Sequence, residues 1–96
     1  MIGIVATLTV QDGKGAEFEP IFRELAAKVR ANEPGNLLYQ LTKSRTDANI
    51  YKVMELYQDQ AALEAHGKTD YFRELGRKMG PCMAAAPSVE YLDAVG

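Results

Sequence analysis

Apolar residues recur with two different periods along this chain, and the order of these periods limits the folds open to it. Residues 2–10 alternate at period two, which is typical of a strand. One side of this segment carries Ile2, Ile4, Ala6, Leu8 and Val10. Residues 16–31 instead space their apolar side chains three or four apart, which predicts an amphipathic helix. That stripe consists of Phe18, Ile21, Phe22, Leu25, Ala26 and Val29.

The rest of the chain continues the alternation of strand and helix. The segments NLLYQLTKS (36–44) and IYKVMELY (50–57) predict two strands, and the polar turn between them indicates an antiparallel hairpin. Asp59 is a predicted N-cap for the helix QAALEAH, which Gly67 interrupts. Thr69 is predicted to cap a second piece, DYFRELGRKM. A last strand is expected over residues 88–95, SVEYLDAV.

The order βαββαβ predicts a ferredoxin-like α+β fold in a single domain, residues 1–96. Four antiparallel strands would carry both helices on one face. The third predicted strand is apolar on both sides, with Tyr51, Val53 and Tyr57 on one and Ile50, Met54 and Leu56 on the other. Because the helices can cover one face only, we expect the other to pack against a second copy. The prediction is a homodimer joined through the sheet face.

Composition argues against several classes of function. The net charge is −2 and no basic cluster is present, which argues against a nucleic-acid partner. One cysteine and one histidine argue against a structural zinc site within one chain, and this usage suits a cytoplasmic location. The first residues lack the charged region of a signal peptide, and no apolar run is long enough to span a membrane.

The single histidine, His66 in AHGKTDYF, is the first candidate for chemistry. It either packs near a helix end or acts as a general base, since its ordinary pKa is about 6.5. Glu55, within the apolar stretch VMELY, is the second, because burying an unpaired charge is costly. Glu55 could face solvent or the dimer seam, pair with Lys52 or Arg77, or orient His66.

The strand tyrosines form a third group: Tyr39, Tyr51 and Tyr57. Such residues usually pack half-buried, although a hydroxyl could donate to a substrate oxygen, as could Asn36 or Thr7. The sequence does not decide which face of the strands lines a cavity, because each face carries a polar residue: Glu55 on one face and Lys52 on the other face. Four residues are expected in the core or a cavity wall: Met54, Met79, Met83 and Phe72. Cys82 has no activating neighbour in sequence and is interpreted as inert.

Two stretches resemble the antibiotic biosynthesis monooxygenase family. EPGNLLYQL resembles the family's second strand, and YKVMELYQDQAALEAHGKTDYF resembles its third strand and second helix. The signature positions are filled by Tyr51, Glu55, Tyr57, Asp59, Ala62, Leu63, His66, Thr69 and Phe72.

The resemblance implies a dimeric α+β barrel with a cavity between sheet and helices. Some members oxygenate quinols and anthrones without metal, flavin or haem, because the deprotonated substrate supplies the electrons. It therefore implies a cofactor-independent monooxygenase acting on a small quinol-type or polyketide-type aromatic. The implied catalytic residues are His66 and Glu55, and the implied substrate-binding residues are Tyr39, Tyr51, Asn36, Tyr71 and Phe72. The alternatives are a non-oxidative, isomerase-like enzyme acting on a small metabolite and a non-catalytic small-molecule-binding or stress protein.

The chain departs from the family pattern at two positions. Tyr71 stands where members often carry a second histidine, and a phenol with a pKa of about 10 is a poor base near neutral pH. The haem-degrading branch relies on an Asn, a Trp and a His. This chain has no Trp, and Gly76 falls near the place of the ligating His. Both observations argue against haem degradation, and no cofactor is expected.

Overall fold

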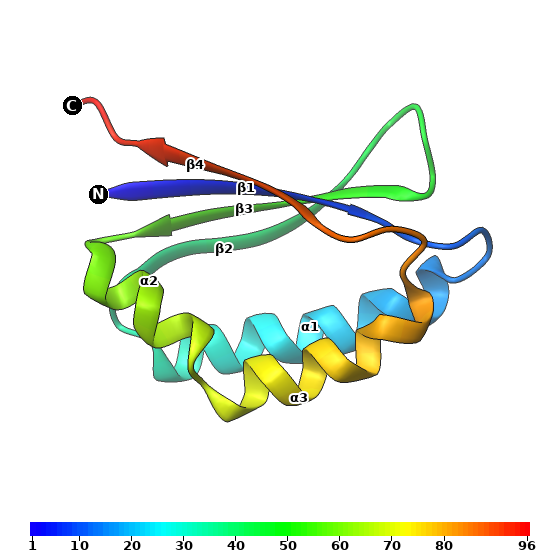
Figure 1. Ribbon diagram of the computed structural model, residues 1–96, viewed down its shortest axis with the longest axis horizontal. Coiled ribbons are helices and arrows are strands. Elements are labelled where there is room, and N and C mark those ends of the chain that lie inside the picture. Colours follow the sequence, from blue (N-terminus) through cyan, green and yellow to red (C-terminus); the bar gives the residue numbers. More distant parts are fainter.

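The computed structural model describes residues 1–96, and its elements follow the predicted order (Figure 1). They are β1 (Ile2–Thr9), α1 (Gly15–Asn32), β2 (Asn36–Lys43), β3 (Ile50–Tyr57), α2 (Gln60–Gly67), α3 (Asp70–Met79), a short 3₁₀ turn (Gly80–Cys82) and β4 (Ser88–Asp93). No helix is long and apolar enough to cross a membrane.

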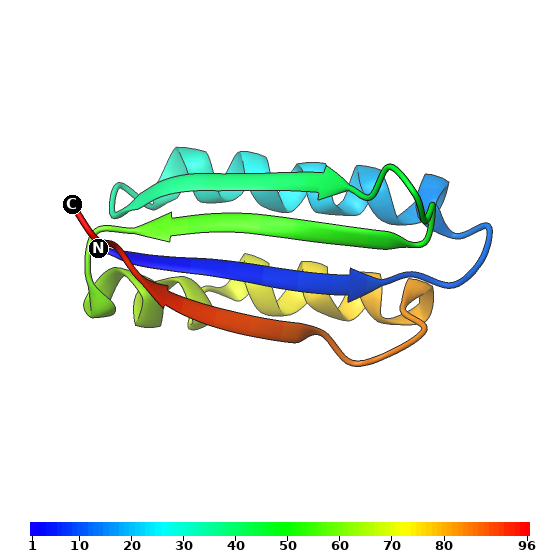
Figure 2. The same ribbon diagram turned by 90° about the horizontal axis from the view of Figure 1, so that it is seen from above.

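The four strands form one antiparallel sheet in the order β2-β3-β1-β4. All the helices lie on one side of it, and Figure 2 shows the strands crossing in front of the helical layer. This is the ferredoxin-like arrangement that the sequence predicts. The last strand is shorter than predicted: its pairing with β1 ends at Ile2 and Asp93, and beyond it only the Ala94 N–H donates to the Met1 carbonyl, at 3.1 Å.

The helix α1 buries the predicted apolar stripe against the sheet: Phe18, Phe22, Leu25, Ala26 and Val29. The helix begins at Gly15 and includes Pro20. Pro20 lies in the first turns, on the exposed side, where the missing N–H removes only one early hydrogen bond.

Two separate caps divide the second helical segment, as predicted. The Asp59 carboxylate accepts from the Ala62 backbone N–H at 2.8 Å, and the Thr69 hydroxyl accepts from that of Phe72 at 3.3 Å. Helix α2 ends at Gly67, so α3 can leave in a new direction. This joint places His66 at the end of α2, against the sheet.

The inner face of the sheet, which the helices cover, holds the core. Its buried strand residues include Ile4, Ala6, Leu8, Tyr39, Tyr51, Val53 and Tyr57. The outer face stays uncovered, although Leu38, Met54 and Leu92 lie there with 42%, 46% and 44% of their surface exposed. Met54 is therefore neither core nor cavity lining, contrary to prediction, because it sits one residue out of step with the buried Val53.

Candidate active site

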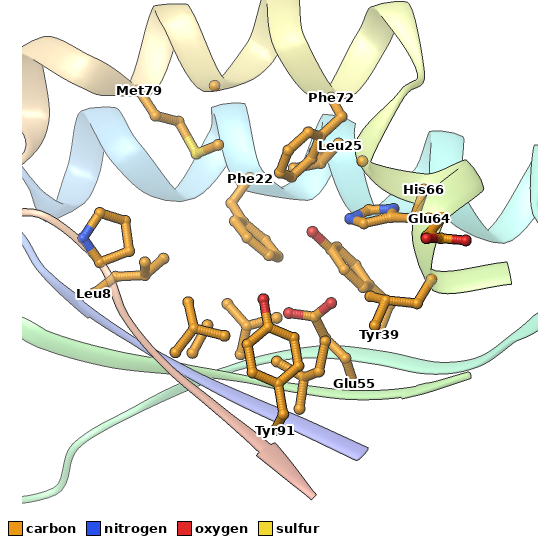
Figure 3. A pocket seen from close by; sticks show the side chains of 18 of the residues that line it. Leu8, Phe22, Leu25, Tyr39, Glu55, Glu64, His66, Phe72, Met79 and Tyr91 are labelled. Atoms are coloured by element: carbon orange, nitrogen blue, oxygen red, sulfur yellow. The ribbon is translucent and has the colours of Figure 1, made fainter. Parts of the chain in front are cut away.

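A cavity of about 640 Å³ lies between the inner face of the sheet and the helices (Figure 3). Its size falls in the usual range for small-molecule sites. Apolar side chains make up most of its wall: Ile4, Ala6, Leu8, Phe18, Phe22, Leu25, Val53, Leu63, Phe72, Met79, Met83, Pro87 and Val89. The polar groups that face it are few, and a ligand held there would be largely removed from water.

The polar side chains on the cavity floor, two tyrosine hydroxyls and one carboxyl group, lie in one row of paired residues across the sheet. In the strand register, Tyr39 of β2 pairs with Glu55 of β3, Glu55 with Ile4 of β1, and Ile4 with Tyr91 of β4. Partners across a sheet share a face, and all four of these residues line the cavity. The sequence did not decide which face of the strands lines the cavity. The structure shows that it is the face that carries Glu55, whereas Lys52 lies exposed on the other face.

His66 forms part of the cavity wall and has 5% of its surface exposed. Its Nδ1 lies 2.9 and 3.1 Å from the two carboxylate oxygens of Glu33. The Tyr71 hydroxyl donates to the same carboxylate. Three aromatic rings surround the imidazole, with centroids 5.2 Å away for Tyr39, 5.6 Å for Tyr57 and 4.7 Å for Phe72.

These contacts determine which nitrogen of His66 is available for chemistry. An ionised carboxylate can only accept hydrogen bonds, so Nδ1 carries the proton in the pair with Glu33. In the neutral ring the lone pair then resides on Nε2. Figure 3 shows a nitrogen of the His66 ring directed toward the cavity interior. The arrangement is that of a general base whose orientation a carboxylate holds.

Local sequence rules explain why Glu33 reaches His66. Pro34 keeps Glu33 from continuing α1, and its backbone adopts φ −121° and ψ 85° at the end of the helix. The next turn approaches α2 so closely that a Cβ on Gly35 would lie 2.6 Å from the Cβ of Ala62. Glycine is thus required at position 35, and the close approach brings the end of α1 to the end of α2.

Of the alternatives that the sequence left open for Glu55, the geometry does not support a pair with His66, whose Nδ1 faces Glu33. The carboxylate of Glu55 instead accepts from the Tyr57 hydroxyl at 2.7 Å, and it pairs with neither Lys52 nor Arg77. Burial raises the pKa of Glu55 above its ordinary value. Glu55 remains a candidate acid in the cavity, while the residue that orients His66 is Glu33.

The structure places Tyr39, a candidate substrate-binding residue, in the cavity wall. Its ring stacks on Phe22 with centroids 5.5 Å apart and an interplanar angle of 6°. In Figure 3 its hydroxyl points into the cavity, and burial raises its pKa. Tyr39 therefore stays a hydrogen-bond donor at any ordinary pH. Phe72, Met79 and Met83 also line the cavity, as expected.

Three predicted substrate-binding residues do not line the cavity. The Tyr51 hydroxyl donates to Glu19 at 2.6 Å on the far side of Phe18, and burial raises its pKa to about 12. The Asn36 amide donates to the Leu38 carbonyl in β2. Tyr71 acts through Glu33, and burial raises the pKa of Tyr71 to about 12. Each of these side chains already has a partner in the fold.

The remaining candidate residues, Thr7 and Cys82, do not line the cavity. Thr7 pairs with Lys52 and Ser88 on the outer face of the sheet. Cys82 is buried with Sγ 3.5 Å from a Glu17 carboxylate oxygen, and burial raises the pKa of its thiol, which keeps it protonated. No group of three or more His, Cys, Asp or Glu residues is placed to hold a metal ion.

Sequence reasoning missed two residues of the site. Glu33 was not among the predicted site residues, although a carboxylate fixed by a following proline at a helix end is a detectable signal. Tyr91 of β4 was not considered, and it stands in the floor row with 66% of its surface exposed. Its position follows from the pairing of β4 with β1, which no local pattern specifies.

A four-stranded antiparallel sheet with all its helices on one face, and a cavity between the two layers, places the chain in the class of small ferredoxin-like α+β proteins. Within this class, the sequence profile of the antibiotic biosynthesis monooxygenase family matches residues 1–78. The chain belongs to this family.

Individual relatives agree with this assignment. A candidate antibiotic biosynthesis monooxygenase from Caulobacter crescentus has a solved structure that is 62% identical, with a TM-score of 0.97 over 99% of this chain and 90% of that one. Another solved antibiotic biosynthesis monooxygenase is 28% identical, with a TM-score of 0.91 over all of both chains. An uncharacterised Synechocystis protein is 29% identical over 91% of this chain, which spans 58% of that relative's length.

Proposed function

We propose that this protein catalyses the oxygenation of a small electron-rich hydroxylated aromatic, of quinol or polyketide type, by molecular oxygen. The observation that carries the proposal is the His66 imidazole, held through Nδ1 by Glu33 at the wall of a largely apolar cavity. The family to which the chain belongs supports the same reaction class. The substrate supplies the electrons, so the proposal invokes no metal, flavin or haem.

The first step is removal of a proton from the substrate hydroxyl by Nε2 of His66. The resulting imidazolium is stabilised by the Glu33 carboxylate, 2.9 Å from Nδ1. The Tyr39 hydroxyl, which points into the cavity in Figure 3, donates to the substrate oxyanion. A base placed in this way typically contributes about 10²–10⁴-fold to a rate. The apolar wall strengthens these interactions by excluding water.

The second step is attack of the electron-rich ring carbon on oxygen. For 1,4-dihydroxynaphthalene, a ring C–H bond breaks, a C–O bond forms and the O–O bond breaks. One oxygen atom remains in 2-hydroxy-1,4-naphthoquinone and the other leaves as water. All four electrons come from the substrate, two through insertion of oxygen and two through oxidation of the quinol. His66 returns its proton to the departing oxygen.

The proposal is tested by oxygen uptake with 1,4-dihydroxynaphthalene in the presence of a metal chelator. We expect uptake above the spontaneous rate, proportional to protein, with one 2-hydroxy-1,4-naphthoquinone formed per oxygen consumed. Catalase should release no oxygen from the mixture, because hydrogen peroxide is not a product. Stoichiometric peroxide, or uptake at the spontaneous rate across a panel of quinols, would refute the proposal.

A second candidate function is isomerisation by proton transfer next to a carbonyl group. Glu55 favours it, because its raised pKa makes it an acid on the same cavity wall as the base His66. His66 would remove a proton from carbon while Glu55 donates one to the carbonyl oxygen, and the reverse steps place the proton on a different carbon. Turnover of a substrate under strict anaerobiosis would favour this function over oxygenation.

We also propose that the protein forms a homodimer through the outer face of the sheet. One row of that face is apolar across all four strands: Leu38, Leu56, Gly3 and Leu92. Exposed apolar surface of this kind usually has a partner. A second identical sheet would cover it with matching residues and produce the closed barrel.

A further inference from the structure

The helix α3 presents one stripe of residues to the cavity, and the stripe has a gap in its middle. Phe72, Gly76 and Met79 are spaced four and three apart, so they share one side of the helix, and all three line the cavity. Figure 3 shows the Phe72 and Met79 side chains projecting from α3 toward the cavity. Gly76 lies between them and contributes no side chain.

Nothing in the fold requires a glycine at this position. A Cβ added to Gly76 would find no atom within 4 Å outside its own helix, in contrast to Gly35. Its φ is not positive, so the backbone suits any L-residue. Glycine also weakens a helix interior relative to alanine. The effect of Gly76 is therefore to leave space in the roof of the cavity.

The floor repeats the same pattern on β1. Ile4, Ala6 and Leu8 share the inner face at period two, and all three line the cavity. Ala6 is the smallest of them and stands between two large side chains. The cavity thus has a small residue in the middle of its roof and another in the middle of its floor.

We propose that Gly76 determines which ligands fit, and that the space beside it holds the flat multi-ring body of a hydroxylated aromatic. The ligand hydroxyl lies at His66, next to Phe72, and its rings extend along α3 past Gly76 toward Met79. Ala6 serves the same purpose on the floor. The position of the hydroxyl rests on the proposed function, whereas the size limit rests on Gly76 and Ala6 alone.

The test compares wild-type protein with the Gly76→Leu variant, using three probes that share one hydroxyl and differ in ring number: phenol, 1-naphthol and 1-anthrol. Dissociation constants are measured under nitrogen. In the wild type we expect affinity to rise with ring number, because more apolar surface is buried. In Gly76→Leu we expect 1-anthrol to bind at least tenfold more weakly and phenol to stay within about twofold.

Folding and the nature of the added side chain are controlled separately. Gly76→Leu should raise Tm by about 4 °C or more, since leucine favours a helix, so lost binding cannot reflect unfolding. Glu74→Leu places the same side chain on the exposed side of α3 and should leave all three dissociation constants unchanged. Ala6→Leu, which narrows the cavity from the floor, should reproduce the loss for 1-anthrol.

Every outcome of these binding measurements either supports or contradicts the proposed role of Gly76. Equal 1-anthrol affinity in wild type and Gly76→Leu would overturn it, as would failure of the wild type to bind any of the larger probes. Binding that depends on Gly76, without oxygen uptake, would support this inference and count against the proposed oxygenation. If wild type and Gly76→Leu took up oxygen equally fast with a three-ring quinol, the result would support the proposed oxygenation and count against the inference about Gly76.

Discussion

A histidine ring becomes an oriented base when one nitrogen is held and the other is free. The two carboxylate oxygens of Glu33 hold Nδ1 of His66, and the hydroxyl of Tyr71 donates to that carboxylate as well. Burial raises the pKa of Tyr71 to about 12, which excludes it as a base near neutral pH. In the proposed mechanism Tyr71 is a positioning residue, because its hydroxyl donates to the carboxylate that holds His66.

The pair of His66 and Glu33 also marks the limit of sequence reasoning at the scale of residues. His66 stood out because it is the one histidine of the chain. Its partner lies 33 residues earlier, at the end of a different helix. Two helix ends meet only after α1 and α2 have packed on the sheet, so no spacing within the sequence could identify the pair.

At the same scale, the raised pKa of Glu55 should make the folded state less stable as the pH rises. Burial raises its pKa in the folded state, so below its ordinary pKa it is neutral in both states and carries no penalty. As pH rises through the ordinary and then the raised value, the folded state loses stability relative to the unfolded state. In Glu55→Gln we therefore expect a Tm equal to that of the wild type near pH 4 and higher at pH 8.

Thermal unfolding of both proteins between pH 4 and pH 8 measures this difference. Contributions from other groups, such as Glu19 with its lowered pKa, are common to both proteins and cancel. Glutamine can still accept from Tyr57, so the hydrogen bond is kept. A Tm difference that is constant with pH would show that Glu55 is not penalised by burial.

At the scale of elements, local rules predicted most of the fold. The caps Asp59 and Thr69 and the break at Gly67 were recognisable because each acts on atoms within three residues. Errors fell where distant segments decide the outcome. The last strand ends at Asp93 because its pairing with β1 ends where β1 begins, at Ile2, and Met54 faces outward because of its register with Val5.

The cap at Asp59 offers a test at this scale, since α2 carries His66 at its far end. Replacing Asp59 with alanine removes the acceptor for the Ala62 N–H and should cost about 1 kcal/mol of folding free energy. For a domain of this size we expect Tm to fall by about 4–8 °C. Asp59→Asn keeps an acceptor oxygen and should restore most of the loss. An unchanged Tm in Asp59→Ala would mean that α2 is held by packing alone.

At the scale of the whole molecule, the helices leave one face of the sheet bare. The strands predicted this, because both of their faces are apolar. They could not predict the cavity, which depends on how far α3 stands from the sheet. Two small residues, Gly76 of α3 and Ala6 of β1, leave space in the cavity from opposite sides.

We expect the bare face to join two copies in solution. Light scattering at micromolar concentration should give twice the chain mass of 10.6 kDa. Met54→Asp places a charge within the proposed interface and should yield monomer. Arg73→Asp, a charge change on the exposed side of α3, is the control and should leave the dimer intact. A monomeric wild type would contradict the proposed dimer.

The central claim is that the imidazole of His66, held by Glu33, acts as the base in oxygenation of a quinol. The most direct measurement is metal-free oxygen uptake with 1,4-dihydroxynaphthalene by the wild type, His66→Ala and Glu33→Gln, each with its Tm. We expect His66→Ala to lose at least about 100-fold in kcat, and Glu33→Gln to lose activity and shift the pH profile. Uptake by His66→Ala equal to that of the wild type would contradict the claim.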